Sequence, residues 1–186
     1  YRPDGVVAGE DLWDVIMEEN TVMSVDYPWN GMNEKLFGIR QGELLTLTSG
    51  TGIGKSSVCR ELCHYLIVQG HKVGYIALEE SVKRSAEGVM GIAMNCPPHL
   101  WERNEVTEEQ KREAFEYSVG SGRMVLYDHF GSQDPENLLH QIRYMNRSMG
   151  CTHIFLDHLS IVVSGMGEGD ERRIIDNTMS KLRSLV

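Results

Sequence analysis

The sequence predicts an α/β fold, with a mainly parallel sheet flanked by helices on both faces. Short apolar runs that are typical of buried strands alternate with longer segments that are typical of helices. This alternation favours parallel strands joined by crossover helices. A glycine-rich turn separates the first apolar run from the helix expected after it. With 186 residues, 41% of them apolar, the chain is long enough for one domain with a sizeable core.

Charge and hydropathy restrict the possible functions. The net charge of −9 argues against a protein that coats nucleic acid through a basic surface, although it does not exclude DNA held by a few loops inside an assembly. No apolar run approaches the ~20 residues that a membrane helix needs, so we expect no membrane association. The chain starts at Tyr1 and stops at Val186 inside a helix-like pattern, so we expect it to be part of a longer protein.

The N-terminal residues predict a short helix on a linker. Apolar residues within Leu12–Met17 form one stripe, and a polar segment follows them. This helix could pack on its own domain or dock on a neighbouring subunit, and the pattern favours neither. Tyr27–Gly31 reads as a loop. We therefore expect a linker that carries this helix over residues 1–25 and one core domain over 26–186.

The first expected strand, Leu44–Leu47, leads into a phosphate-binding loop at Ser49–Ser56. A turn from strand to helix aims successive backbone N–H groups and the positive helix end at one point, which suits a polyphosphate. Lys55 can reach the β- and γ-phosphates, and the Ser56 hydroxyl can ligate Mg²⁺. The strict pattern has glycine where this chain has Ser49. The candidate nucleotide-binding residues are Ser49, Gly50, Thr51, Gly52, Ile53, Gly54, Lys55, Ser56 and Ser57.

The elements expected after the loop alternate between helix and strand up to the last helix, which follows a glycine-rich loop. In order they are a helix from Lys55 to about Gln69 ended by Gly70, a strand over 73–78, a helix from Glu80 to about Met94, a surface helix over 107–118 opening at Thr107, a strand over 124–128, a helix from Pro135 to about Met149, a strand from Ile154, and a helix from Asp170.

Four cysteines indicate a reducing, cytosolic compartment. Cys59, Cys63, Cys96 and Cys151 show no paired metal-ligand spacing. Cys59 and Cys63 lie one turn apart on an expected helix, so a zinc site is an alternative there. Buried thiols are the favoured interpretation.

Two carboxylates at strand ends complete a candidate hydrolytic site. Asp157 ends an apolar strand pattern and is the expected second holder of Mg²⁺. Glu79 ends the preceding strand pattern and is the expected catalytic base, together with Lys55 as the other catalytic residue. Glu80 is expected to start the next helix, where a carboxylate suits the positive end. The roles of Glu79 and Glu80 could be exchanged, because strand ends are uncertain.

Two further features have open interpretations. His158 could sense the γ-phosphate, although a packed histidine at a strand end is the favoured interpretation. The glycine-rich loop before the last helix could offer backbone N–H groups to a DNA phosphate, or it could be only a connector. The candidate DNA-binding residues are Ser164, Gly165, Met166, Gly167, Glu168 and Gly169.

Several stretches together resemble the helicase half of the ring-shaped primase-helicases of T-seven-like bacteriophages. That family is related to the DnaB replicative helicases, the mitochondrial Twinkle helicase and, more distantly, the RecA recombinase. The resemblance covers nearly the whole chain in order. The stretches that carry it are Arg2–Val7, Thr48–Ser56, Leu78–Ser81, and Leu156–Ser164 continuing through Gly167–Arg172, the last being the most specific.

The resemblance implies a RecA-like core in a homohexameric ring that hydrolyses ATP or dTTP with Mg²⁺ and moves 5′ to 3′ on single-stranded DNA. It implies that Lys55 and Ser56 bind phosphates and Mg²⁺, that Glu79 is the catalytic carboxylate and that Asp157 is the second-motif aspartate. Leu12–Met17 would dock on the adjacent subunit, and Ser164–Glu171 would face the ring channel. Primase and DNA polymerase at the replication fork are the implied partners, in a host bacterial cytoplasm.

The resemblance also places several functional parts outside this chain. The γ-phosphate sensor, later DNA loops, base-stacking residues and arginine finger are expected after Val186, and a primase before Tyr1. The segment by itself is therefore expected not to unwind DNA. Two alternatives stay open: a RecA-type recombinase or regulatory ATPase, which would share Glu79 and Asp157, and a small-molecule kinase, which would need an acceptor pocket and a lid.

Overall fold

The computed structural model describes residues 8–17, 24–129, 134–159 and 171–186. Three turns of 3₁₀-helix, η1 (Gly9–Asp11), η2 (Pro98–Leu100) and η3 (Val119–Ser121), join longer elements. The helices are α1 (Trp13–Met17), α2 (Asn30–Leu36), α3 (Lys55–Val68), α4 (Val82–Ala93), α5 (Glu108–Tyr117), α6 (Pro135–Arg147) and α8 (Glu171–Arg183). The strands are β1 (Ser24–Val25), β2 (Ile39–Arg40), β3 (Val73–Ala77), β4 (Met124–Tyr127) and β5 (His153–Asp157).

A parallel sheet of order β4-β3-β5 forms the centre of the chain. Strand β3 pairs with β4 from Val73 opposite Met124, and with β5 from Val73 opposite His153. Because β3 lies between two strands and two layers of helices, all of its residues are buried, which explains its nearly continuous apolar sequence. The expected parallel sheet is confirmed for these three strands.

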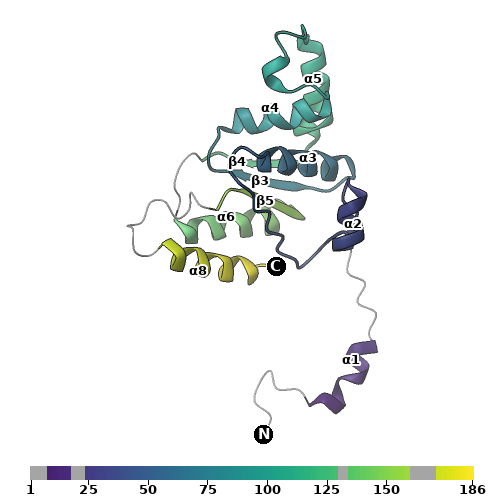
Figure 1. Cartoon of the computed structure of the whole chain (residues 1–186), viewed down its shortest axis with the longest axis vertical. Helices are drawn as coiled ribbons and strands as arrows, with labels where there is room; N and C mark the ends of the chain where they lie inside the picture. The colour runs from purple at the N-terminus through teal and green to yellow at the C-terminus, as the bar shows by residue number, and fades with distance from the viewer. Residues whose placement is uncertain (1–7, 18–23, 130–133, 160–170) are drawn as a thin grey trace.

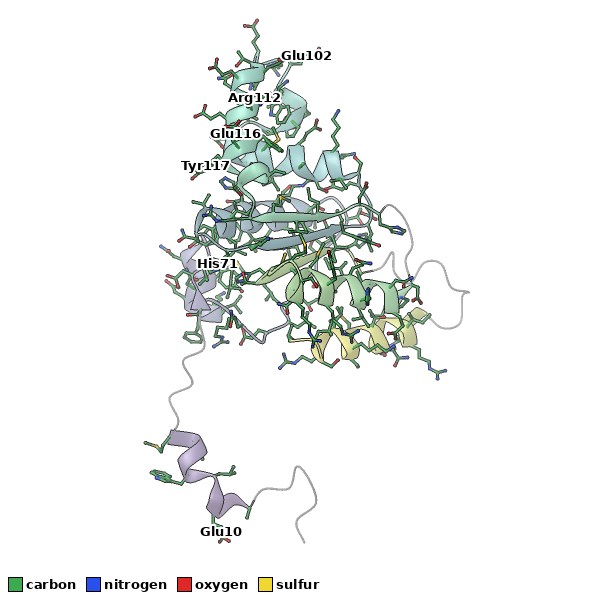
Figure 2. The ribbon with its side chains drawn as sticks, turned by 180° about the vertical axis from the view of Figure 1, so that it is seen from behind. Glu10, His71, Glu102, Arg112, Glu116 and Tyr117 are labelled. Atoms are coloured by element: carbon green, nitrogen blue, oxygen red, sulfur yellow. The ribbon has the colours of Figure 1, made fainter. Side chains whose placement is uncertain are left out.

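Helices cover both faces of the sheet, as the sequence predicts. Helices α3 and α4 lie on one face, and α6 with α8 lies on the other (Figure 1). Alternate β3 residues point to the two layers: Tyr75 packs with Leu66 of α3, and Ile76 packs with Leu138 of α6. A third, smaller core joins α4 to Trp101 and α5, and Figure 2 labels Arg112, Glu116 and Tyr117 along α5, which extends away from the sheet.

Local capping signals fix three helix starts. The Ser81 side chain accepts a hydrogen bond from the backbone N–H of Arg84 at the start of α4, and Asp134 does the same for Asn137 before Pro135 opens α6. Thr107 and Gln110 form a reciprocal capping box at α5. These starts lie within a residue or two of those predicted, because each depends on neighbouring residues alone.

The expected strand at Leu44–Leu47 is not formed among the described residues. Residues 43–50 have no helix or strand assignment, and Leu45 and Leu47 are about half exposed. Leu44 and Leu45 line an open hollow of about 500 Å³ with residues from α2, β2 and Arg183. An apolar run becomes a strand only where a neighbouring strand takes its backbone hydrogen bonds, and β5 pairs here with β3 alone. The strand prediction is therefore wrong for this structure.

The loop predicted at Tyr27–Gly31 is only half correct, because α2 begins at Asn30. Tyr27 is buried, and its backbone N–H donates a hydrogen bond of 2.7 Å to the side-chain oxygen of Asn33. The side-chain amide of Asn33 donates in return to the backbone carbonyl of Tyr27. These paired bonds hold the start of the helix without a capping side chain. Strands β1 and β2 form a small antiparallel pair that the sequence did not indicate.

The cysteines are free thiols, and no described helix has the length and apolar content to cross a membrane. Burial raises the pKa of the Cys63 thiol to about 12, and the same helix carries Cys59 one turn earlier. No cluster of three or more His, Cys, Asp or Glu side chains in the described ranges could hold a metal ion. The zinc alternative therefore has no support here, and the buried thiol is confirmed for Cys63.

We expect Leu66→Ala to destabilise the fold by about 2–5 kcal/mol, because Leu66 is fully buried between α3 and the sheet. Val68→Ala is the matched control on the same helix, where the side chain is 44% exposed, and we expect a change within about 0.5 kcal/mol. Urea unfolding of both variants measures the difference. Equal unfolding midpoints would contradict the packing described for α3.

Candidate nucleotide-binding site

The predicted phosphate loop forms a turn that leads directly into α3. Gly54 has a φ of 101° and precedes the first helical residue, Lys55, while Gly52 has a φ of 77°. Only glycine adopts such angles without strain, so the turn depends on these two positions. Residues 49–53 are exposed, and the free N–H groups of the first turn of α3 face the same side as the loop.

Lys55 folds back over the loop. Its ammonium donates hydrogen bonds of 3.0 Å to the carbonyl oxygens of both Ser49 and Gly50. These two bonds hold a positive charge over the loop, beside the start of α3. A bound phosphate would replace these carbonyls as the hydrogen-bond acceptor of the Lys55 ammonium, because neutral carbonyls are weaker partners for an ammonium than a charged phosphate is.

Glu79 and Asp157 come from neighbouring parallel strands. Asp157 is the last residue of β5 and lies opposite Ala77, and its carbonyl accepts a hydrogen bond of 2.9 Å from the backbone N–H of Leu78. Glu79 is the next residue after Leu78, so both carboxylates stand at the carboxyl edge of the sheet. This is the edge at which open α/β sheets bind ligands.

Glu79 is exposed and has one described polar partner. Its side chain is 62% exposed, and its Oε2 lies 3.3 Å from Nδ1 of His158, the residue after Asp157. His158 itself is about one-third exposed. It lies directly after the end of β5, beside the candidate base.

Glu80 has a different environment from Glu79. Its Oε2 accepts a hydrogen bond of 2.5 Å from Nη2 of Arg60 on α3, and its Oε1 accepts one of 2.7 Å from the Ser85 hydroxyl on α4. Glu80 precedes the helix cap Ser81, so the expectation that Glu80 starts the helix is wrong. Its carboxylate pairs with an arginine on α3 instead of capping the start of α4.

The side of α3 that faces the sheet lies close to Asp157. Burial and, after it, the charge of Asp157 raise the pKa of the Cys59 thiol to about 11. Burial also raises the pKa of Tyr75, and the charge of Asp157 is the next largest cause. The Tyr75 hydroxyl is buried without a hydrogen-bond partner among the described residues. Asp157 therefore lies near the face of α3 that packs on the sheet, and α3 is the helix that begins with Lys55 and Ser56.

The structure brings the predicted loop and both predicted carboxylates to one end of the sheet. Sequence reasoning missed Arg60 and Ser85 as partners of Glu80, and His158 as a partner of Glu79. An arginine in the helix after the loop, facing two consecutive acids at a strand end, is the only sequence signal that could have suggested the Arg60 contact. The predicted DNA loop at 164–169 lies outside the described residues.

Comparison with known protein families matches residues 25–186 to the DnaB-like helicase C terminal domain. The chain is 37% identical over 193 aligned residues to a DNA helicase/primase of Enterobacteria phage T3, an alignment that covers 98% of this chain and 34% of the phage protein. It is 24% identical over 154 residues to a probable plasmid replicative DNA helicase of Chlamydia trachomatis serovar L2, covering 80% of this chain and 33% of that protein.

The chain thus spans about a third of the length of these curated relatives. The family match extends over nearly the whole chain and includes the phosphate loop, both carboxylates and every strand of the parallel sheet. Together with the phage relative, it shows that the chain belongs to the DnaB-like helicase C-terminal domain family.

Proposed function

We propose that this chain is the nucleotide-hydrolysing part of a replicative DNA helicase motor, which moves 5′ to 3′ on single-stranded DNA and unwinds the duplex at a replication fork. The observation that supports this best is the meeting of the phosphate loop, Glu79 and Asp157 at one edge of a parallel sheet. A phosphate loop alone indicates nucleotide binding. Carboxylates at the two neighbouring strand ends add a ligand for Mg²⁺ and a base for the attacking water, and hydrolysis requires both.

Residues 49–57 bind the nucleotide phosphates in this proposal. The N–H groups at the start of α3 and the Lys55 ammonium supply positive charge at one point, and Gly52 and Gly54 let the backbone approach closely. Lys55 is also proposed as a catalytic residue, because charge on the γ-phosphate oxygens grows during transfer.

A magnesium ion fits the oxygen donors near this loop. The Ser56 hydroxyl and the Asp157 carboxylate are hard oxygen ligands, which suit Mg²⁺ when nucleotide phosphates and water supply the rest. When bound, Mg²⁺ would neutralise phosphate charge. ATP and dTTP are both candidate substrates.

Glu79 acts as the general base. Its carboxylate orients the attacking water and accepts its proton as the oxygen approaches the γ-phosphorus. The exposure of Glu79 leaves it accessible to water, whereas both oxygens of Glu80 already accept hydrogen bonds. This contrast supports Glu79 over Glu80, the choice that the sequence left open.

The ring, the DNA and the fork partners are also part of the proposal. Residues 1–25 form a linker whose helix α1 docks on the next subunit of a homohexamer, and 26–186 form the core. In Figure 1, α1 lies apart from the sheet, with Trp13, Ile16 and Met17 at least 60% exposed. Residues 164–169 contact single-stranded DNA in the channel. The phage relative's name supports primase as a partner, and DNA polymerase would work at the same fork.

A RecA-type recombinase or regulatory ATPase is the alternative function. Two measurements separate these functions. Stimulation of hydrolysis by single-stranded DNA distinguishes the helicase from a kinase, and unwinding of a forked duplex distinguishes it from a recombinase.

We expect Lys55→Ala to abolish both hydrolysis and nucleotide-dependent ring formation in the full-length protein, because it removes the charge over the loop. Lys83→Ala is the control, since Lys83 is an exposed lysine on α4 paired only across the helix surface with Glu87. Nucleoside-triphosphate turnover and light scattering measure the two effects. Turnover at the parental rate in Lys55→Ala would contradict the phosphate-loop assignment.

We expect Glu79→Gln to retain nucleotide binding and to lower kcat by about 10²–10⁴-fold, the usual contribution of a general base. Binding of a fluorescent nucleotide and steady-state hydrolysis measure the two quantities. If Glu80→Gln caused the larger loss of kcat and Glu79→Gln did not, Glu80 would be the base.

We expect Ile16→Asp to prevent ring assembly, because a charge would replace an apolar side chain on the docking face of α1. Val68→Asp provides the control, since it places the same charge on an exposed apolar site of α3. Size-exclusion chromatography with light scattering, in the presence of nucleotide and Mg²⁺, reports the oligomer. Rings of unchanged mass in Ile16→Asp would contradict the docking role.

A further inference from the structure

We propose that Arg60 and Glu80 are positioning residues for the catalytic carboxylate. The pair fixes the backbone between β3 and α4, so that the preceding residue, Glu79, projects toward the phosphate loop. This inference rests on the proposed role of Glu79 as the general base.

The Arg60–Glu80 pair joins two segments that meet at the site. Arg60 lies in α3, the helix that begins at the phosphate loop, and Glu80 lies directly after Glu79. Their side chains are only 19% and 13% exposed, and the contact between Nη2 and Oε2 is 2.5 Å. Burial disfavours the charged form of Arg60, but the hydrogen bond and charge of Glu80 outweigh this and raise the pKa of Arg60. Arg60 is therefore held as a cation.

The second oxygen of Glu80 fixes the other side of the connection. It accepts a hydrogen bond from the hydroxyl of Ser85, which is fully buried in the first turns of α4. One oxygen of Glu80 is thus bound to α3 and the other to α4. The backbone at residues 79–81 has little freedom to rotate, because Glu80 is held by both helices and Leu78 is bonded to β5.

Gly88 of α4 shows how closely the guanidinium is held. A Cβ atom at Gly88 would lie 2.5 Å from Nε of Arg60, far inside van der Waals contact. The guanidinium therefore lies against the bare backbone of α4. Its Nε is buried and has no hydrogen-bond partner within the described ranges.

This arrangement is a poor means of stabilising the fold. A buried ion pair often contributes no more than apolar side chains of similar volume, and an unsatisfied buried N–H lowers the stability of the fold. Both costs are explained if the ion pair serves to place a neighbouring group precisely. A misplacement of 1 Å in a reacting group can lower a rate about 10²-fold. Glu79 is the reactive group next to the pair.

The decisive variant removes both charges at once, because deleting one partner would leave the other buried and unpaired. We expect Arg60→Met/Glu80→Gln in the full-length protein to fold and to keep the parental KM for ATP or dTTP within about threefold. We expect its kcat to fall about 10–100-fold. Arg60→Lys, which keeps the charge without the planar fork, should give an intermediate kcat.

Arg84→Met is the matched control. Arg84 also lies near Glu80, at 3.7 Å, but its side chain is 79% exposed, so its pairing should contribute little. We expect parental kcat and KM. A parental kcat in Arg60→Met/Glu80→Gln would overturn the positioning role. A loss of nucleotide affinity in proportion to the loss of kcat would also overturn it, because the pair would then support the structure of the whole site.

Adding Glu79→Gln separates this inference from the proposed function. If the pair acts through Glu79, then Arg60→Met/Glu80→Gln should cause no further loss of kcat in a Glu79→Gln background. A full additional loss there would overturn the positioning role alone. Parental turnover in Glu79→Gln by itself would instead overturn the proposed base and, with it, the hydrolytic site.

Discussion

The pairing of β3 between β4 and β5 is the constraint on which the site depends. Because β3 is hydrogen-bonded on both edges and covered by helices on both faces, its end cannot shift relative to the end of β5. The bond from Leu78 to Asp157 extends this ladder past the last paired residues. The separation of the two carboxylate-bearing positions is therefore set by the backbone, and the side chains only decide the direction in which each acid points.

Glu79 and Glu80 illustrate how environment separates two identical side chains. They are adjacent in sequence, yet one is exposed beside His158 and the other is enclosed by Arg60 and Ser85. Both oxygens of Glu80 already accept hydrogen bonds, whereas the exposed carboxylate of Glu79 can meet water directly. In our proposal, Glu80 holds the backbone and Glu79 faces the nucleotide.

The parts of the fold that follow from local signals were predictable. Gly70 ends α3, the capping box at Thr107 opens α5, and the apolar sequence of β3 marks a central strand. The turn that leads into α3 belongs to this group, because its glycines and Lys55 are nearly consecutive in the chain. Each of these signals lies within one turn of the element that it defines.

What the sequence could not supply depends on contacts between distant residues. Arg60 and Glu80 are 20 residues apart and meet only because α3 and α4 lie on the same face of the sheet. Leu44–Leu47 has the composition of a strand, but composition does not provide a pairing edge. For the same reason the choice between Glu79 and Glu80 needed the surroundings of each side chain.

The glycines of α4 exchange helical tendency for close packing. Gly88 faces Arg60, and a Cβ at Gly91 would lie 2.9 Å from Pro98, so neither position has room for a side chain. Each glycine weakens an isolated helix by about 1 kcal/mol relative to alanine. The two glycines lower the helical tendency of α4, so this helix depends in part on its packing against α3 and the Pro98 turn.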